Sequence, residues 1–243
     1  MSNLLSKFVR VGAVGALLAA GVPTAGAFAA ANAAPAPAGN GPAPGTLNPV
    51  NKSTPEFDAF RKAWDGLTNY TGTIVSHETT NDGKQAQNRT YTYKFVKPNA
   101  ALITVIAGPG KGGGAAWHGG PKVKGRQGGM ISFLKITLAK NDPRAMSLRG
   151  DQIDAASFGF QLDHFATVPG ALTETKTADG TLVTLVPQVP EPGGVTKETL
   201  TFSASSHLPM KREQFVGERS VETAVYADVK LNEPNLKDSD IDV

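Results

Sequence analysis

The chain has no cysteine among its 243 residues. This excludes a disulfide-bonded scaffold, a thiol nucleophile, a thiolate-bound zinc or iron–sulfur centre, and a lipid-modified N-terminal cysteine. Aromatic residues are also scarce, at 7 %. Basic side chains exceed acidic ones by only three charges, and Lys7 and Arg10 near the N-terminus carry two of these. We therefore expect no nucleic-acid partner.

The N-terminus has the pattern of a secretory signal peptide. Lys7 and Arg10 precede an apolar run at 11–22, which is too short to span a bilayer core of about 30 Å. Small residues typical of a cleavage site follow at 25–27 and again at 31–33. We expect removal of residues 1–27, or of 1–33 if the later site is used, and the alternative is a retained signal anchor. Later apolar runs are short, so we expect no transmembrane span in the mature form.

The segment 34–53 is rich in Ala, Pro and Gly and carries no charge up to residue 50. Such a segment cannot build a core, so we expect an extended, disordered linker. The rest, 54–243, has the length of one domain. An exported chain without cysteine is typical of a bacterial envelope, so we expect it in the periplasm or the extracellular space of a bacterium.

The expected domain begins with an amphipathic helix. A capping box with Pro in the first turn occupies 53–56, and apolar residues then recur at helical spacing. The helix should end near 66–69. The apolar residues are Phe57, Phe60, Trp64 and Leu67.

The remainder is rich in strand patterns, with turn signals about every ten residues, as in an antiparallel meander. The expected strands are 70–79, 87–96, 101–107, 115–118, 122–126, 171–176, 181–186, 196–203, 210–216 and 221–231. The run 130–139 is apolar enough for a short helix or a buried strand, and its alternation favours a strand. A second helix is expected near 154–165, where Phe158, Leu162 and Phe165 share one face, although Gly159 weakens it.

The segment 108–129 contains ten glycines and four cations. A phosphate-binding loop needs Gly-Lys-Ser/Thr at the start of a helix, and this pattern is missing here. We expect a mobile loop followed by a hairpin that turns at 119–120. The cations could still bind an anionic partner, and they are Lys111, Lys122, Lys124 and Arg126.

No catalytic pattern is evident. None of the four histidines has the spacing of a metal site, and no nucleophile elbow occurs. Ser205-Ser206-His207 places a serine beside a histidine, but we expect this segment to form a turn. We therefore expect no catalytic residues, no metal, no cofactor and no enzymatic activity.

Several patches occur in an order that resembles the LolA/LolB-like superfamily, envelope proteins related to outer-membrane lipoprotein carriers. They are Arg89-x-Tyr91-x-Tyr93-x-Phe95-Val96-Lys97-Pro98-Asn99, Trp117-His118 in a hairpin, 208–212, 226–232 and 239–242. The resemblance implies an α+β fold: a strongly curved antiparallel β-sheet, an incomplete β-barrel, with helices covering the concave side. It also implies an apolar cavity that takes up acyl chains. Carriers place an Arg before the Pro-Asn corner as a lid latch, and Lys97 stands there in this chain.

These observations lead to two functional hypotheses. The first is a non-enzymatic, monomeric envelope carrier or sensor that binds a lipid or the acyl chains of lipoproteins, with another envelope protein as a candidate partner. The second is a secreted interaction or structural module that binds an anionic partner through the cationic loop 108–129. For the first hypothesis, the expected lining is Tyr91, Tyr93, Phe95, Ile103, Val105 and Trp117, although ordinary core packing would also explain these residues.

Overall fold

A computed structural model describes residues 53–129 and 133–243. The expected signal peptide and nearly all of the expected linker lie outside the described residues, as do the first three positions of the expected strand 130–139.

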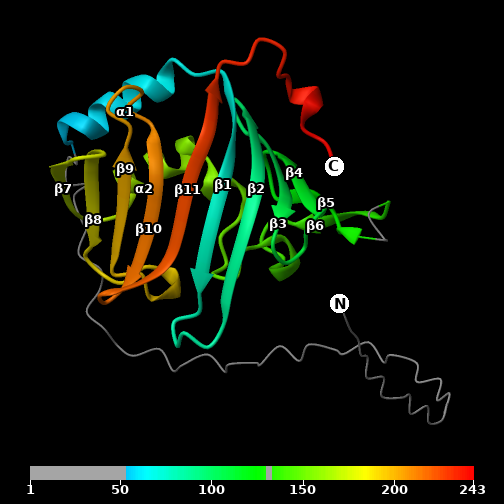
Figure 1. Ribbon diagram of the computed structural model, residues 1–243, viewed down its shortest axis with the longest axis horizontal. Helices are drawn as coiled ribbons and strands as arrows, with labels where there is room; N and C mark the ends of the chain where they lie inside the picture. The colour runs from blue at the N-terminus through cyan, green and yellow to red at the C-terminus, as the bar shows by residue number, and fades with distance from the viewer. Residues whose placement is uncertain (1–52, 130–132) are drawn as a thin grey trace, which may run out of the picture. The chain divides into compact units, whose positions relative to one another are not determined.

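The described residues form one antiparallel sheet of eleven strands, in the order β6-β5-β4-β3-β2-β1-β11-β10-β9-β8-β7 (Figure 1). The chain runs as two meanders, and the last strand pairs with the first. The two edge strands, β6 and β7, are not paired with each other, so the sheet stays open. The strands are β1 (Asn69–Thr79), β2 (Ala86–Val96), β3 (Ala100–Ala107), β4 (Gly114–His118), β5 (Lys122–Arg126), β6 (Lys135–Ala139), β7 (Gly170–Thr177), β8 (Gly180–Pro187), β9 (Lys197–Phe202), β10 (Pro209–Val216) and β11 (Arg219–Leu231).

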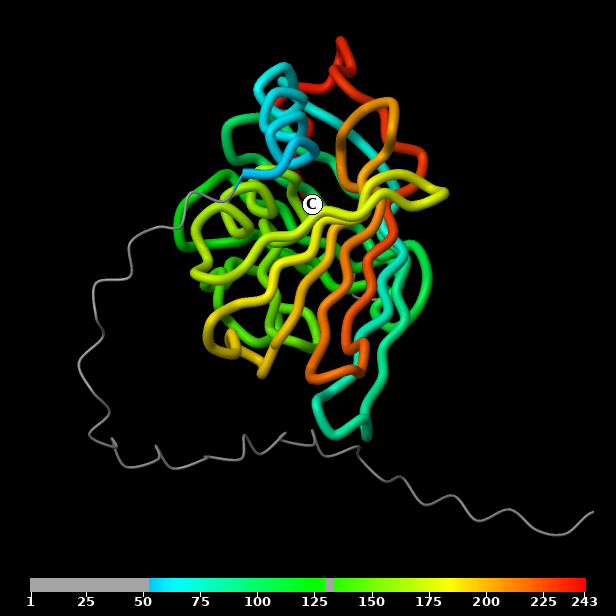
Figure 2. The backbone as a smooth tube through the Cα atoms, turned by 90° about the vertical axis from the view of Figure 1, so that its left-hand side faces the viewer, coloured from blue at the N-terminus to red at the C-terminus, as the bar shows by residue number. Residues whose placement is uncertain are grey.

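Two α-helices, α1 (Pro55–Asp65) and α2 (Phe158–Thr167), lie on the concave side of this curved sheet (Figures 1 and 2). Short 3-10 turns complete the described chain: η2 (Pro143–Ala145), η3 (Ile153–Ala156), η4 (Pro192–Gly194) and η5 (Asp238–Asp240). This confirms the predicted α+β fold, a half-barrel with helices on its concave face.

Both predicted helices are present, and their caps fix where they start. Thr54 caps α1, because its hydroxyl accepts a hydrogen bond from the Phe57 backbone N–H at 3.3 Å. Ser157 caps α2 in the same way through the Phe160 N–H, at 3.1 Å. The second helix therefore begins four residues later than expected, since the 3-10 turn η3 and an extended Ser157 precede it.

The scarce aromatic residues are concentrated where the helices meet the sheet. Tyr70 stacks on Phe158 with ring centroids 4.4 Å apart, and on Phe95 at 5.4 Å. The Tyr70 hydroxyl accepts a hydrogen bond from the Phe158 N–H at 3.1 Å. Phe60 of α1 lies 5.2 Å from Phe202 of β9. One half of the concave face is thus filled by the protein's own side chains.

The apolar run 130–139 differs from the expectation of a buried strand. Only Lys135–Ala139 forms strand β6, whose side chains are mostly exposed, and Phe133 before it is 80 % exposed. One face of this edge strand is only partly covered, since Ile136 and Leu138 are half-buried and Leu138 packs against the core. The apolar convex face of β3, by contrast, is covered, because Ala100 packs with Ile241 and Val243 near the C-terminus.

Candidate functional site

The other half of the concave face is hollow. A cavity of about 630 Å³ lies between strands β1–β4, β10 and β11 and the segments around η2 and η3. This volume is in the range of small-molecule sites. Its lining runs from buried residues such as Glu222 to exposed loop residues such as Gly110 and Lys111, so the cavity opens to solvent beside the glycine-rich loop.

Strand register builds the apolar wall of the cavity. Tyr91 of β2 pairs with Ile74 of β1 and with Val105 of β3, so all three side chains point to the concave face. Tyr226 of β11 pairs with Ile74 on its other side. The opposite wall comes from the segments around η2 and η3, through Met146, Ile153, Ala155 and Ala156.

The structure separates the six predicted lining residues into two sets. Tyr91, Ile103 and Val105 line the cavity. Tyr93, Phe95 and Trp117 do not; they are buried in the core beneath the helices. Alternation along a strand predicts the face correctly, but it does not predict which part of that face the helices cover.

Two glutamates, Glu78 and Glu222, line the buried end of the cavity. Glu78 of β1 pairs directly with Glu222 of β11, and the row continues through Gln214 of β10 to Glu198 of β9. We call these four residues the polar row. Like charges directly opposite each other in a sheet are destabilising, and both Glu78 and Glu222 are buried. Sequence reasoning missed this row.

Arg212 is the cation that balances part of the row. Its Nε and Nη2 donate to the two carboxylate oxygens of Glu198 at 3.0 and 3.2 Å. Its Nη1 lies 3.6 Å from Glu222 and 3.9 Å from Asp151. Gln214 also donates to Glu198, at 2.9 Å. Glu198 therefore accepts two hydrogen bonds from Arg212, whereas Glu222 and Asp151 lie only within ion-pair distance of it.

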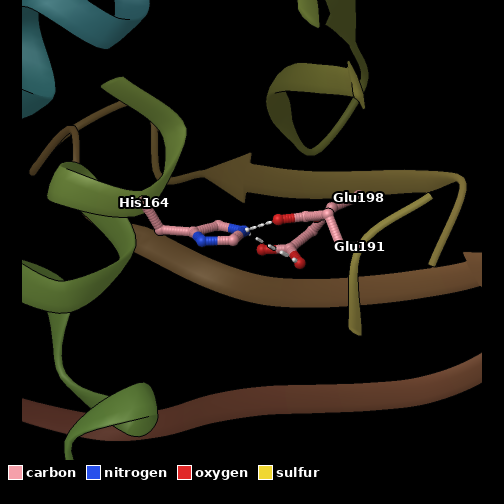
Figure 3. A group of neighbouring side chains, drawn as sticks. All are labelled: His164, Glu191 and Glu198. Carbon is pink, nitrogen blue, oxygen red and sulfur yellow. Dashed lines mark ion pairs between the residues drawn. The ribbon is translucent and has the colours of Figure 1, made fainter. Parts of the chain in front are cut away.

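His164 of α2 joins the same network from the helix side (Figure 3). Its Nε2 lies 3.4 Å from Glu191 and 3.6 Å from Glu198. Burial would lower the pKa of His164, but the two carboxylates raise it to about 9. Burial would likewise raise the pKa of Glu198, but Arg212 and His164 together lower it to about 2.

Within 53–129 and 133–243, His164, Glu191 and Glu198 are the one group of three whose ligand atoms lie close enough for a metal ion. Glu198 already accepts three hydrogen bonds from Arg212 and Gln214. A metal ion there would add positive charge beside a guanidinium group. We therefore assign the group as an ion-paired histidine rather than a metal centre.

Lys97, the position of the lid latch in the resemblance, lies outside the cavity lining. Its ammonium donates to the Trp64 backbone carbonyl at the end of α1 and lies 4.1 Å from the centroid of the Trp64 ring. Burial lowers its pKa. Lys97 thus fastens α1 to the corner between β2 and β3.

The four loop cations do not share one environment. Lys111 and Arg126 line the cavity, and Lys124 pairs with Asp242 near the C-terminus at 3.0 Å. Lys122 lies exposed at the start of β5. The hairpin that carries these residues is confirmed, and it turns at Gly119 and Gly120, whose φ angles are 78° and 76°.

Comparison with known proteins gives structural matches only. The sequence matches no protein-family model and no curated protein. A DUF1329 family protein from Desulfovibrio piger is 10 % identical, with a TM-score of 0.44 over 77 % of this chain and 95 % of that one. A putative outer membrane lipoprotein-sorting protein domain from Vibrio parahaemolyticus is 9 % identical, with a TM-score of 0.43 over 76 % and 95 %. A LolA superfamily protein from Nitrosomonas europaea is 12 % identical, with a TM-score of 0.39 over 79 % and 99 %.

At these identities the likeness concerns the fold, which the strand order of this chain already establishes. No helix in the described part of the chain is long and apolar enough to cross a membrane.

Proposed function

We propose that this protein binds the apolar chain of a lipid, or an acyl chain of a lipoprotein, in the cavity beside η3, and that it does so as a non-enzymatic carrier or sensor of the bacterial envelope. The observation that carries the proposal is the division of the concave face. The helices fill one half with aromatic side chains, whereas about 630 Å³ beside them has an apolar wall and no filling side chain.

The chemistry of the wall fits an alkyl chain. Ile74, Ile103, Val105 and Met146 offer aliphatic surface, and Ala115 and Ala156 leave room between them. Each methylene that leaves water for such a site gains about 0.8 kcal/mol. Affinity should therefore rise about fourfold per added methylene until the cavity is full.

The experiment combines extraction and binding on the full chain. Native mass spectrometry of the purified protein should show a bound lipid, and a fluorescent fatty acid should be displaced by alcohols of increasing chain length. No bound lipid together with no displacement at any length would refute the proposal.

A matched pair of variants locates the site. Ala115 lines the cavity, whereas Val225 is 38 % exposed and lies outside the lining. Ala115→Phe should abolish displacement at longer chain lengths because the ring occupies the space of the chain. Val225→Phe adds a ring outside the cavity and should leave binding unchanged.

The cationic-loop hypothesis has less support, because its four cations lie in different surroundings. It remains a prediction, and neutralising Lys111, Lys122, Lys124 and Arg126 together would test it. Loss of binding to an anionic vesicle, with alcohol binding retained, would favour it.

A further inference from the structure

We propose that the polar end of the cavity binds a cationic group, so that the ligand is an amphiphile with an apolar chain and a protonated amine. This inference rests on the proposed function, since the apolar chain must occupy the cavity. It adds the chemical class of the group at the chain's end.

The first argument is the surplus of acid at the buried end. Glu78 and Glu222 face each other across β1 and β11, and Asp151 approaches from the segment before η3. All three line the cavity. Arg212 is the cation beside them, and Glu198 binds it through two hydrogen bonds.

The second argument is the set of oxygen atoms without a partner. Glu222 Oε2 and Asp151 Oδ2 are buried and have no hydrogen-bond partner among the described residues. The side chain of Glu222 is only 7 % exposed. A buried carboxylate without a donor is costly, and burial raises the pKa of Glu222 despite the opposing charge of Arg212. Burial and the neighbouring Asp151 favour a proton on Glu222, and an ammonium group would supply both charge and donors.

Three further cations line the cavity: Arg144 pairs with Asp142 at 2.8 Å, and Lys111 and Arg126 lie in the glycine-rich segment. Two other cations, Arg89 and Arg149, are directed elsewhere. Arg89 donates through Nε to the Pro109 carbonyl in the glycine-rich loop. The guanidinium of Arg149 binds the Thr79 carbonyl, the Asn81 side chain and the Gly193 carbonyl. Only the backbone N–H of Arg149 reaches Glu78, at 3.1 Å.

The uncharged groups at this end are engaged as well. Ser76 donates to Glu78 at 3.2 Å, and the Tyr226 hydroxyl donates to the Ala156 carbonyl at 3.2 Å. Neither hydroxyl hydrogen is left for Glu222. None of the described residues is a donor to the two unpartnered oxygens, so their donors come from water, from a proton shared by Glu222 and Asp151, or from a ligand.

The spacing of the carboxyl groups favours an organic cation over a metal ion. In the described part of the chain, Glu78, Asp151 and Glu222 do not form a group of three with ligand atoms within 4.8 Å of one another. Ca²⁺ and Mg²⁺ require oxygen ligands at about 2.0–2.6 Å from one ion. An ammonium on an alkyl chain needs no such convergence, and the apolar wall adjoins the acidic end.

The test compares three probes with the same chain, dodecylamine, dodecanol and dodecanoate, measured by displacement of an uncharged fluorescent lipid. We expect dodecylamine to bind at least tenfold more tightly than dodecanol. Glu222→Gln should weaken the amine by about tenfold to a hundredfold, since hydrogen bonds to charged groups are of that strength, and should leave dodecanol unchanged. Glu218→Gln removes the same charge at a fully exposed turn and serves as control.

The outcomes separate this inference from the proposed function. Tight dodecanol or dodecanoate binding without preference for the amine would overturn the inference and keep the function. No binding of any probe would overturn both. Should Glu222→Gln lose its circular-dichroism signal, Asp151→Asn replaces it, and an unchanged amine affinity in that folded variant would overturn the inference.

Discussion

Replacing His164 with Gln should remove a part of the protein's stability that depends on pH. The histidine side chain is only 17 % exposed and lies between Glu191 and Glu198. Burial alone would favour the neutral ring, yet the two carboxylates raise its pKa to about 9. The folded state therefore holds a proton that the unfolded chain, with an ordinary histidine pKa of about 6.5, releases earlier.

The sign and size of the effect follow from that difference. The pKa is raised on folding, so the contribution is complete below about pH 6.5 and is lost as the pH rises through about 9. A pKa that rises from 6.5 to about 9 on folding corresponds to about 3 kcal/mol at pH 5. At pH 7.4 about 2 kcal/mol should remain, and at pH 10 almost none.

The assay is urea unfolding of the wild type and His164→Gln at pH 5, 7.4 and 10. Burial raises the pKa of Glu222. Glu222 therefore destabilises the folded state once the pH rises above the pKa that this side chain has in the unfolded chain, but it does so in both proteins. The difference between the two unfolding free energies therefore isolates His164. Packing changes add a constant, so the informative quantity is the change in that difference from pH 5 to pH 10.

A matched control uses His118, which lies at the surface 3.1 Å from Asp238 with its side chain 49 % exposed. The difference in unfolding free energy between His118→Gln and the wild type should be nearly the same at all three pH values, because exposed ion pairs contribute little. If the corresponding difference for His164→Gln were also constant from pH 5 to pH 10, the network of His164, Glu191 and Glu198 would not hold a proton at neutral pH, which would contradict the prediction.

Two further substitutions test how the helices are fixed. Gly159→Ala should destabilise the protein by about 1–3 kcal/mol in urea unfolding, although Ala is the better helix former, because its Cβ would meet Trp64 Cζ2 at 2.5 Å; a gain in stability would contradict this packing. Thr54→Ala should cost about 1 kcal/mol in the same assay, since the Phe57 N–H loses its cap. Thr54→Ser retains the hydroxyl and should restore most of that loss.

Much of the fold follows from local sequence patterns. Strands β1 and β2 are both expected from the sequence, and Asp82-Gly83 in the turn between them supplies the positive φ, 72° at Gly83, that a hairpin favours. The inward residues of β2 include the predicted Tyr91, Tyr93 and Phe95. What local patterns do not contain is the environment of a position. From the sequence, Gly159 is expected to weaken its helix. In the structure it allows the helix to pack against Trp64, whose ring occupies the space that a side chain at position 159 would take.

The candidate site was predictable only in part, and the reason is register. Glu78 and Glu222 stand 144 positions apart, and nothing local indicates that β1 pairs with β11 to bring them opposite each other. A weaker signal was nevertheless present. Counting in steps of two from the buried Ile74 reaches Glu78, and counting from the buried Tyr226 reaches Glu222.

Charged residues at the alternate positions of a strand that face the core therefore indicate a candidate site before the strand pairing is known. Glu198 and Arg212 occupy the inward face as well, and both are buried. A core needs no such residues, and each one costs free energy to bury. Their presence at one end of the concave face is what motivates the proposal of a ligand at that end. Arg212 and His164 balance Glu198, whereas Glu222 and Asp151 keep oxygens without donors, and it is this local imbalance that points to a ligand.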